Sequence, residues 1–184
     1  MVVSSTSEEI LRQKIKNFSQ YRTPCQRLSW NKYFFDLAYL VAARSPDAQT
    51  RHGAVIVDKE NRIVSTGYNG FPANGPDEIL PNLRPEKYPY MVHAEMNALF
   101  AARCDVRGYS VYITGLPCKN CLLHLIGAGI LKIFAGTTKF QEDPESMYAK
   151  AVLCEVYGVE VYTHGSDDHD KIMPWDHKNW MLGS

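Results

Sequence analysis

The sequence lacks three features that would each point to a particular class of protein. It lacks an excess of charge, because 20 basic residues balance 20 acidic residues in the 184-residue chain, whereas strong nucleic-acid binders usually carry a basic excess. It has no apolar run approaching the roughly 18 residues of a membrane span, and it shows no apolar signal core. We therefore expect neither a nucleic acid nor a membrane among its partners.

The sequence also lacks the even cysteine count of a disulfide framework, because it contains five cysteines. Two of them, Cys118 and Cys121, form a C-x-x-C pair that suits a metal site better than a disulfide. We interpret Cys25, Cys104 and Cys154 as unligated thiols, the last of them in the core. This cysteine usage is typical of a reducing compartment, so we expect a cytoplasmic protein.

Hydrophobic periodicity predicts alternating strands and helices after an initial hairpin. The predicted helices cover residues 30–44, 91–103, 117–128 and 144–157, and the predicted strands cover residues 52–58, 62–68, 109–114, 131–135 and 159–162. The stretch 67–89 is rich in Gly and Pro and is expected to be an irregular loop. Helical connections between strands favour parallel crossovers. We expect an α/β fold, a three-layer αβα sandwich with a five-stranded mixed β-sheet.

The predicted domain, residues 29–163, lies between two terminal segments. Residues 1–28 form an N-terminal extension with a short amphipathic helix, and residues 164–184 form a polar C-terminal tail. Trp175 and Trp180 in this tail are expected to dock on the body or on another subunit. The tail histidines lie among aspartates, where a solvated acidic tail is favoured over a metal patch; they are His164, His169 and His177.

Two short motifs point to the chemistry. His93-Ala94-Glu95 begins one predicted helix, and Pro117-Cys118-Lys119-Asn120-Cys121 begins another; the pattern H-x-E…P-C-x-x-C is a known signature of zinc-dependent base deaminases. One imidazole and two thiolates supply three ligands to a tetrahedral zinc and leave the fourth position for water. Glu95 is then free to move protons. The motifs predict a zinc-dependent hydrolytic deaminase.

The spacing within each motif sets a requirement on the structure. Cys118 and Cys121 lie three residues apart at a helix start, where the helix N-terminus stabilises thiolates. His93 and Glu95 lie two residues apart, and such residues diverge in the middle of a helix, so both must lie in the first turn. A zinc that only stabilises the fold would need a fourth protein ligand. We interpret His124, the other histidine beside the motifs, as a helix-surface residue.

Further stretches carry a family resemblance. They are Ser29-Trp30, Gly53-Ala54-Val55-Ile56-Val57, Gly67-Tyr68-Asn69-Gly70-Phe71-Pro72, His93-Ala94-Glu95-Met96-Asn97-Ala98-Leu99 and Ile126-x-Ala128-Gly129-Ile130. Over roughly residues 29–163 the chain resembles the deoxycytidylate (dCMP) deaminase family of the zinc-dependent cytidine deaminase-like superfamily. The resemblance implies an αβα sandwich that converts dCMP to dUMP with release of ammonia, on a route to thymidylate.

The resemblance also implies roles for individual residues. The zinc ligands are His93, Cys118 and Cys121, and Glu95 is the proton shuttle. The implied substrate-binding residues are Asn69 at the sugar, the Ala94 backbone at the base, Arg51 at the phosphate, and Arg103, Tyr162 and Pro117 as further candidates. An arginine suits a phosphate because its guanidinium forms a bidentate fork. The alternative for Arg51 is a solvated surface charge.

The resemblance implies cofactors and partners as well. One Zn²⁺ per chain is expected, because residues 67–92 contain no Cys or His for the second, structural zinc of some members. A further expectation is Mg²⁺ with dCTP as activator, dTTP as inhibitor, and a homo-oligomer with a hexamer favoured. The sequence Ala73-Asn74-Gly75 departs from the family, whose members often continue with Arg or Ser and Gly in this effector-site loop.

Two other functions stay open. A deaminase acting on a base in RNA, of the tRNA adenosine type, shares the zinc motifs but requires a basic binding surface, and the neutral net charge disfavours it. A catalytically silent regulatory or structural subunit would keep the fold and lose Glu95, which is present. Hydrolysis of dCMP is therefore the favoured function.

Overall fold

The structure is a computed structural model that describes residues 5–23, 25–73, 75, 77–136, 142–165 and 168–176. The helices of the domain are α2 (Trp30–Ala42), α3 (Ala94–Ala101), α4 (Lys119–Gly127) and α5 (Pro144–Tyr157). The strands are β1 (Gly53–Val57), β2 (Ile63–Tyr68), β3 (Ser110–Ile113), β4 (Lys132–Ala135), β5 (Glu160–Gly165) and β6 (Asp168–Pro174). Every helix and strand predicted for the domain is present, with ends shifted by a few residues.

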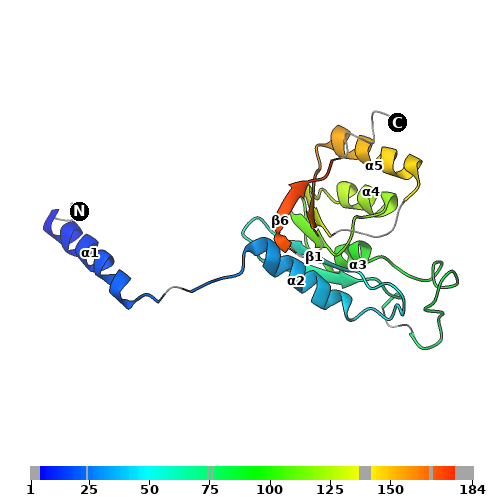
Figure 1. Cartoon of the computed structure of the whole chain (residues 1–184), viewed down its shortest axis with the longest axis horizontal. Helices are drawn as coiled ribbons and strands as arrows, with labels where there is room; N and C mark the ends of the chain where they lie inside the picture. Colours follow the sequence, from blue (N-terminus) through cyan, green and yellow to red (C-terminus); the bar gives the residue numbers. More distant parts are fainter. Residues whose placement is uncertain are drawn as a thin grey trace.

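The strands form one mixed sheet in the order β2-β1-β3-β4-β5-β6 (Figure 1). β1 is antiparallel to both β2 and β3, whereas β3, β4 and β5 are parallel to one another, with α4 and α5 as the connections. β6 is antiparallel to β5 at the edge. The α/β class and the mixed sheet are confirmed, but the sheet has six strands where five were predicted.

The sixth strand comes from the segment that was predicted to be a polar tail. His164 on β5 is buried and its ring lies 4.3 Å from that of Phe35 on α2, while His169 on β6 forms a hydrogen bond of 2.9 Å with Asp36. These two histidines therefore belong to the packing of the domain, and the boundary at residue 163 lies too early. An edge strand exposes one side to water, so its polar composition resembles that of a tail.

Helices cover both faces of the sheet, as predicted for a three-layer sandwich. On one face α2 packs against a cluster that contains Val55, Val57 and Tyr112. On the other face α3, α4 and α5 enclose a larger cluster that contains Ala54 and Ile56. Because alternate residues of β1 enter the two clusters, the apolar run of this strand is buried on both sides.

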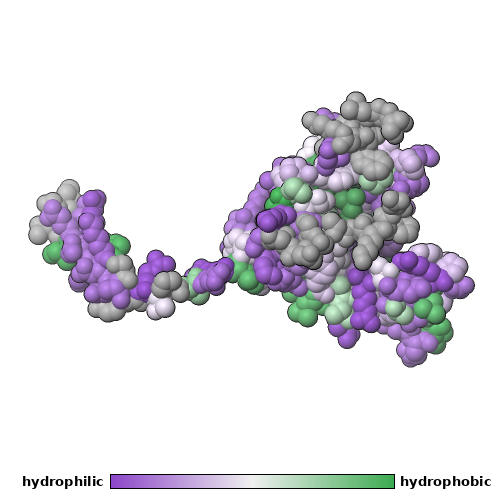
Figure 2. Space-filling view, viewed as in Figure 1, coloured by the Kyte–Doolittle hydropathy of each residue, from purple (hydrophilic) through white to green (hydrophobic). Residues whose placement is uncertain are grey.

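The N-terminal extension contains α1 (Ser5–Asn17) and the 3-10 helix η1 (Phe18–Tyr21). Figure 1 shows α1 set apart from the sandwich, and Figure 2 shows hydrophobic side chains on its surface. Ile10, Leu11, Ile15 and Phe18 are all exposed. The predicted short helix is therefore present and does not pack on the domain. None of the described helices is long and apolar enough to cross a membrane.

The contact between α2 and β1 is so close that only glycine fits at its centre. A Cβ atom on Gly53 would lie 2.0 Å from the carbonyl oxygen of Ala38 and 2.7 Å from the backbone nitrogen of Ala42. We expect Gly53→Ala to lower the free energy of unfolding by about 1–3 kcal/mol through overpacking, measured by denaturant unfolding of zinc-loaded protein.

The matched control is Gly127→Ala on α4, where an added Cβ meets nothing within 4 Å. That variant should keep its stability or gain about 0.4–1 kcal/mol. An equal loss of stability in both variants would contradict the packing argument at Gly53.

Candidate zinc and active site

Three ligand atoms converge at one place in the structure. The Nδ1 atom of His93 lies 3.6 Å from Sγ of Cys118 and 3.3 Å from Sγ of Cys121, and the three atoms all lie within 4.8 Å of one another. A tetrahedral zinc with Zn–S of about 2.3 Å and Zn–N of about 2.0 Å requires N···S separations of about 3.5 Å. The donor set and the two N···S distances therefore fit a tetrahedral zinc ion.

Helix caps bring these ligands together. His93 is the N-cap of α3 with φ −70° and ψ 156°, and Cys118 is the N-cap of α4 with φ −66° and ψ 163°. Because the N-cap backbone is extended, its side chain does not follow the helical periodicity. His93 and Glu95 therefore both lie at the ligand cluster, although they are two residues apart. Each of the two helices thus begins at a ligand.

The cap positions correct two predicted helix starts. The helix predicted from Met91 begins at Ala94, and Pro117 precedes the cap of α4 instead of occupying its first helical position. The physical reason is that Sγ of Cys118 accepts a hydrogen bond from the backbone N–H of Cys121 at 3.5 Å, which is the bond that an N-cap side chain makes.

The hydrogen bonds within the cluster set its protonation. The hydrogen bond with Cys121, and next to it the one with His93, lower the pKa of Cys118 to about 3 against the opposing effect of burial. The hydrogen bond with Cys118, together with burial, raises the pKa of Cys121, and the bond with Cys118 also raises that of His93. Without metal the cluster therefore holds one thiolate and one thiol.

Glu95 lies against this cluster from inside α3. Its side chain is 6% exposed, and burial raises the pKa of its carboxyl group. Glu95 and the Cys121 thiol are close enough for each to affect the pKa of the other. A buried carboxyl group with a raised pKa exchanges protons near neutral pH more readily than an exposed one.

A buried ion pair, Asp47 with Lys87, organises the loops beside the cluster. The Lys87 ammonium lies 2.6 Å from both carboxylate oxygens, and both side chains are 3% exposed. Burial opposes ionisation of Asp47, but the hydrogen bonds from Lys87 and from the N–H groups of Thr50 and Gln49 outweigh it and lower the pKa of Asp47. Sequence reasoning missed this pair, because its partners lie 40 residues apart.

Asn69, the predicted sugar contact, is part of the same network. Its Nδ2 group donates to Oδ2 of Asp47 at 3.1 Å and to the carbonyl oxygen of Thr50 at 3.0 Å. Its Oδ1 atom accepts from the backbone N–H of His52 at 2.7 Å. Both amide protons are therefore used within the protein, and Oδ1, which has a second lone pair, is the atom left for a ligand.

Three further predicted residues lie at the edge of the sheet where the cluster lies. Ala94 is the first residue of α3 and is fully buried. The carbonyl oxygen of Pro117 accepts a hydrogen bond of 3.2 Å from the buried Lys150, which fixes the chain before Cys118. Arg51 is exposed, and its Nε donates to the carbonyl oxygen of Asp47 at 3.3 Å.

The structure does not bring Arg103 and Tyr162 to the cluster. Arg103 follows the C-terminal end of α3, about 12 Å of helix from its N-terminus. Tyr162 on β5 stacks on Phe134, which packs with the cluster under α2, on the opposite face of the sheet. Strand alternation thus turns Tyr162 away from the zinc ligands. Both were predicted substrate contacts, and within a single chain neither lies beside the zinc ligands.

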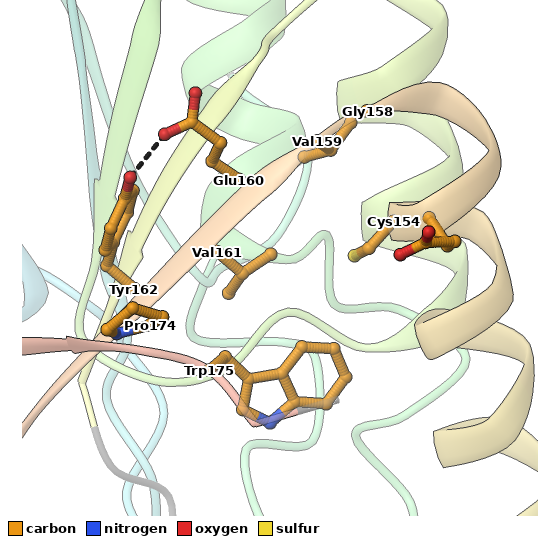
Figure 3. A pocket seen from close by; sticks show the side chains of 9 residues that line it. Cys154, Gly158, Val159, Glu160, Val161, Tyr162, Pro174 and Trp175 are labelled. Carbon is orange, nitrogen blue, oxygen red and sulfur yellow. Dashed lines mark hydrogen bonds between the residues drawn. The ribbon is translucent and has the colours of Figure 1, made fainter. Parts of the chain in front are cut away.

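Tyr162 instead borders a separate hollow of about 370 Å³ between α5, β5 and the segment after β6 (Figure 3). Trp175 forms one wall of it and packs against the core, so this indole docks on the body as predicted. Trp180 and His177 lie outside the described residues. No zinc ligand lines this hollow, and it is not the candidate active site.

The cysteines and the histidine predicted to play no part in the chemistry lie as expected. Cys154 is 2% exposed in the core, and Cys25 and Cys104 are exposed free thiols. His124 is exposed on α4, with Nδ1 at 2.6 Å from the carbonyl oxygen of Asn120. Among the described residues, the His93 cluster is the one group of three that could hold a metal ion.

Comparisons with known proteins agree with this geometry. The model of the family described as the cytidine and deoxycytidylate deaminase zinc-binding region matches residues 28–137. Human deoxycytidylate deaminase is 39% identical over 133 residues, which are 68% of this chain and 75% of that protein. The probable deoxycytidylate deaminase of Drosophila melanogaster is 32% identical over 171 residues, 86% of this chain and 83% of that protein.

A solved structure shares the fold. The dCMP deaminase of the cyanophage S-TIM5, in complex with dCMP and dUMP, superposes with a TM-score of 0.61 and covers 76% of this chain and 100% of that one. At 22% sequence identity this likeness shows the fold alone.

The protonation of the metal-free cluster predicts how zinc binding depends on pH. Because the pKa values of His93 and Cys121 are both raised, zinc must displace protons from them, and its affinity should fall as the pH falls. We expect a loss of at least about tenfold between pH 8 and pH 6, measured by competition with a chromophoric chelator.

The control is Cys104→Ser, which changes an exposed cysteine outside the cluster and should give the same pH profile. An affinity that does not change over this pH range would show that the cluster carries no displaceable proton.

Proposed function

Because the chain belongs to the cytidine and deoxycytidylate deaminase zinc-binding family, we propose that it hydrolyses dCMP to dUMP and releases ammonia. The observation that carries this proposal is the zinc-compatible cluster of His93, Cys118 and Cys121 with the buried Glu95 beside it. The relatives named deoxycytidylate deaminase support the choice of substrate.

The three ligands would hold one Zn²⁺ per chain. Such an ion supplies Lewis-acid activation of water near neutral pH. His93 presents Nδ1 to the thiols, so this ring nitrogen is the ligand. The buried Lys150 donates a hydrogen bond to the Pro117 carbonyl oxygen, and this bond holds the backbone just before Cys118 in place.

Glu95 moves the protons of the reaction. Its carboxylate accepts one proton from the attacking water and delivers it to the ring nitrogen of cytosine. It then takes the second proton from the hydroxyl group newly bonded to the base and gives it to the departing amine. The carbon–oxygen bond forms in the addition step, and the carbon–nitrogen bond to ammonia breaks in the elimination that follows, with one water consumed in total. Its raised pKa suits a group that must both take up and release protons.

The remaining predicted contacts are assigned to the substrate by their positions. The Ala94 backbone at the start of α3 faces the base, next to Pro117. Oδ1 of Asn69 is the acceptor available for a sugar hydroxyl, and Arg51 is the exposed cation for the 5′-phosphate. Phosphate recognition by arginine is charge-assisted and geometrically specific.

Regulation and assembly follow from the family resemblance and form part of the proposal. dCTP with Mg²⁺ is the activator, dTTP the inhibitor, and a homohexamer the working form. A cytoplasmic location is supported by the cysteines, since all five are free thiols. The RNA-directed alternative and a silent subunit receive no specific support, and Glu95 is in place beside the ligands.

Ammonia release from purified, zinc-loaded protein tests the proposed function directly. The substrates are dCMP, deoxycytidine, dCTP and an adenosine-containing tRNA stem-loop, each with and without dCTP and Mg²⁺. We expect turnover confined to dCMP, because the exposed Arg51 is the cation proposed for its 5′-phosphate. Stimulation by dCTP would support the proposed regulation, and size measurement on the same sample tests the hexamer.

Activity on the stem-loop alone would contradict the proposal and favour the RNA-directed deaminase. Absence of turnover with every substrate, with zinc bound, would favour the silent subunit.

Substitution of Glu95 tests its role separately from metal binding. Glu95→Gln keeps the size of the side chain and removes its ability to carry a proton, so kcat should fall by about 10²- to 10⁴-fold. Zinc content, measured by metal analysis, should remain at one ion per chain. A Glu95→Gln enzyme with near wild-type kcat would rule out this proton shuttle.

A further inference from the structure

A second exposed arginine, Arg84, contacts the segment of the chain that carries Arg51. Arg84 belongs to the turn 83–87, which is closed by a hydrogen bond of 3.0 Å from the backbone N–H of Lys87 to the carbonyl oxygen of Leu83. Its guanidinium donates to Oγ1 of Thr50, the residue before Arg51, at 2.5 Å. The Arg84 guanidinium therefore contacts the residue that directly precedes Arg51 in the chain.

Neither guanidinium is neutralised by a carboxylate. Within the described part of the chain, neither Arg51 nor Arg84 forms an ion pair. The nearby carboxylate, Asp47, is already paired with Lys87 in a buried contact. Both positive charges are therefore available to an anionic ligand such as a phosphate.

The backbone of both arginines is fixed in advance. The buried Asp47–Lys87 pair connects the turn that carries Arg84 to the turn that carries Arg51. The backbone N–H of Arg84 also donates to Oε1 of Gln49 at 2.7 Å. Breaking a buried pair leaves an uncompensated charge and is strongly unfavourable, so the two turns keep one relative position. Such preorganisation lowers the entropy cost of binding a ligand.

His52 follows Arg51 in the chain and contacts the segment that leads to the ligands Cys118 and Cys121. Its Nδ1 lies 3.1 Å from Oγ1 of Thr114, which follows β3 on the way to Cys118. Burial lowers the pKa of His52, and the positive charge of His93 lowers it further. The carboxylate of Asp47 opposes this shift, and Arg84 adds to it more weakly. One imidazole therefore lies within electrostatic range of both the metal cluster and Arg84.

We propose that Arg84 is a specificity-determining residue that binds the phosphate of the nucleotide together with Arg51. This inference rests on the proposed function and adds a residue that the motifs did not indicate. Thr50 orients the guanidinium through one N–H group and leaves the other donors for phosphate oxygens. A substrate without phosphate would leave this cation unused.

Binding of the product and of its dephosphorylated form tests the proposal without requiring turnover. The zinc-loaded full chain is titrated with dUMP and with deoxyuridine by calorimetry. The dissociation constant of deoxyuridine divided by that of dUMP measures phosphate recognition. Arg84→Ala should reduce this ratio by about 10- to 100-fold, through weaker dUMP binding, with deoxyuridine affinity and zinc content unchanged. Arg84→Lys should recover part of the ratio, because a lysine keeps the charge and loses the fork.

The matched control is Arg62→Ala. Arg62 is an exposed arginine just before β2, at the opposite end of β1 from Arg51 and about 17 Å away along the strand. It should keep the wild-type ratio. Its loss of charge equals that of Arg84→Ala, so it separates a local phosphate contact from a change in the overall field of the protein.

The outcomes separate this inference from the proposed function. An unchanged ratio in Arg84→Ala, or an equal loss for dUMP and deoxyuridine, would overturn the role of Arg84, even if the wild-type chain deaminates dCMP. A wild-type chain that binds dUMP through Arg84 but releases no ammonia from dCMP would overturn the proposed function and leave the phosphate contact standing.

Discussion

The candidate site depends on the convergence of two helix N-termini at one edge of the sheet. His93 and Cys118 occupy the N-cap positions of α3 and α4. Their backbone is extended, so their side chains do not follow the helical periodicity. Cys121 completes the group from the first turn of α4. Because the helix dipole stabilises negative charge at this end, the same geometry that gathers the ligands also favours the thiolate that a metal requires.

The close packing of α3 on the sheet keeps this geometry rigid. A Cβ atom on Gly67 of β2 would lie 2.2 Å from the backbone nitrogen of Ala98. Ser65 and Asn97 add hydrogen bonds between β2 and α3 at 2.8 Å each. The metal half of the site therefore rests on secondary structure. The proposed substrate contacts Asn69 and Arg51 lie in loops, and there a buried ion pair replaces the core as the element that fixes positions.

The sequence predicted the elements and the metal ligands better than the surroundings of the site. Periodicity gave α5 with its observed ends, and the spacing of His93, Cys118 and Cys121 indicated a shared metal. The family resemblance implied that Tyr162 contacts the substrate, and the sequence does not show which face of the sheet a strand residue occupies until the register is known. Sequence reasoning missed β6, because an exposed edge strand lacks the apolar alternation of a buried one.

The sequence by itself determined the chemistry, because the donor set and the carboxyl group lie within two short motifs whose local cap geometry orients them. Tertiary structure decided the recognition. Asp47 and Lys87 meet across 40 residues, and their contact joins the segments that carry Arg51 and Arg84. No local pattern encodes a pairing between two irregular loops, since only the folded sheet and helices fix the distance that a buried ion pair must span.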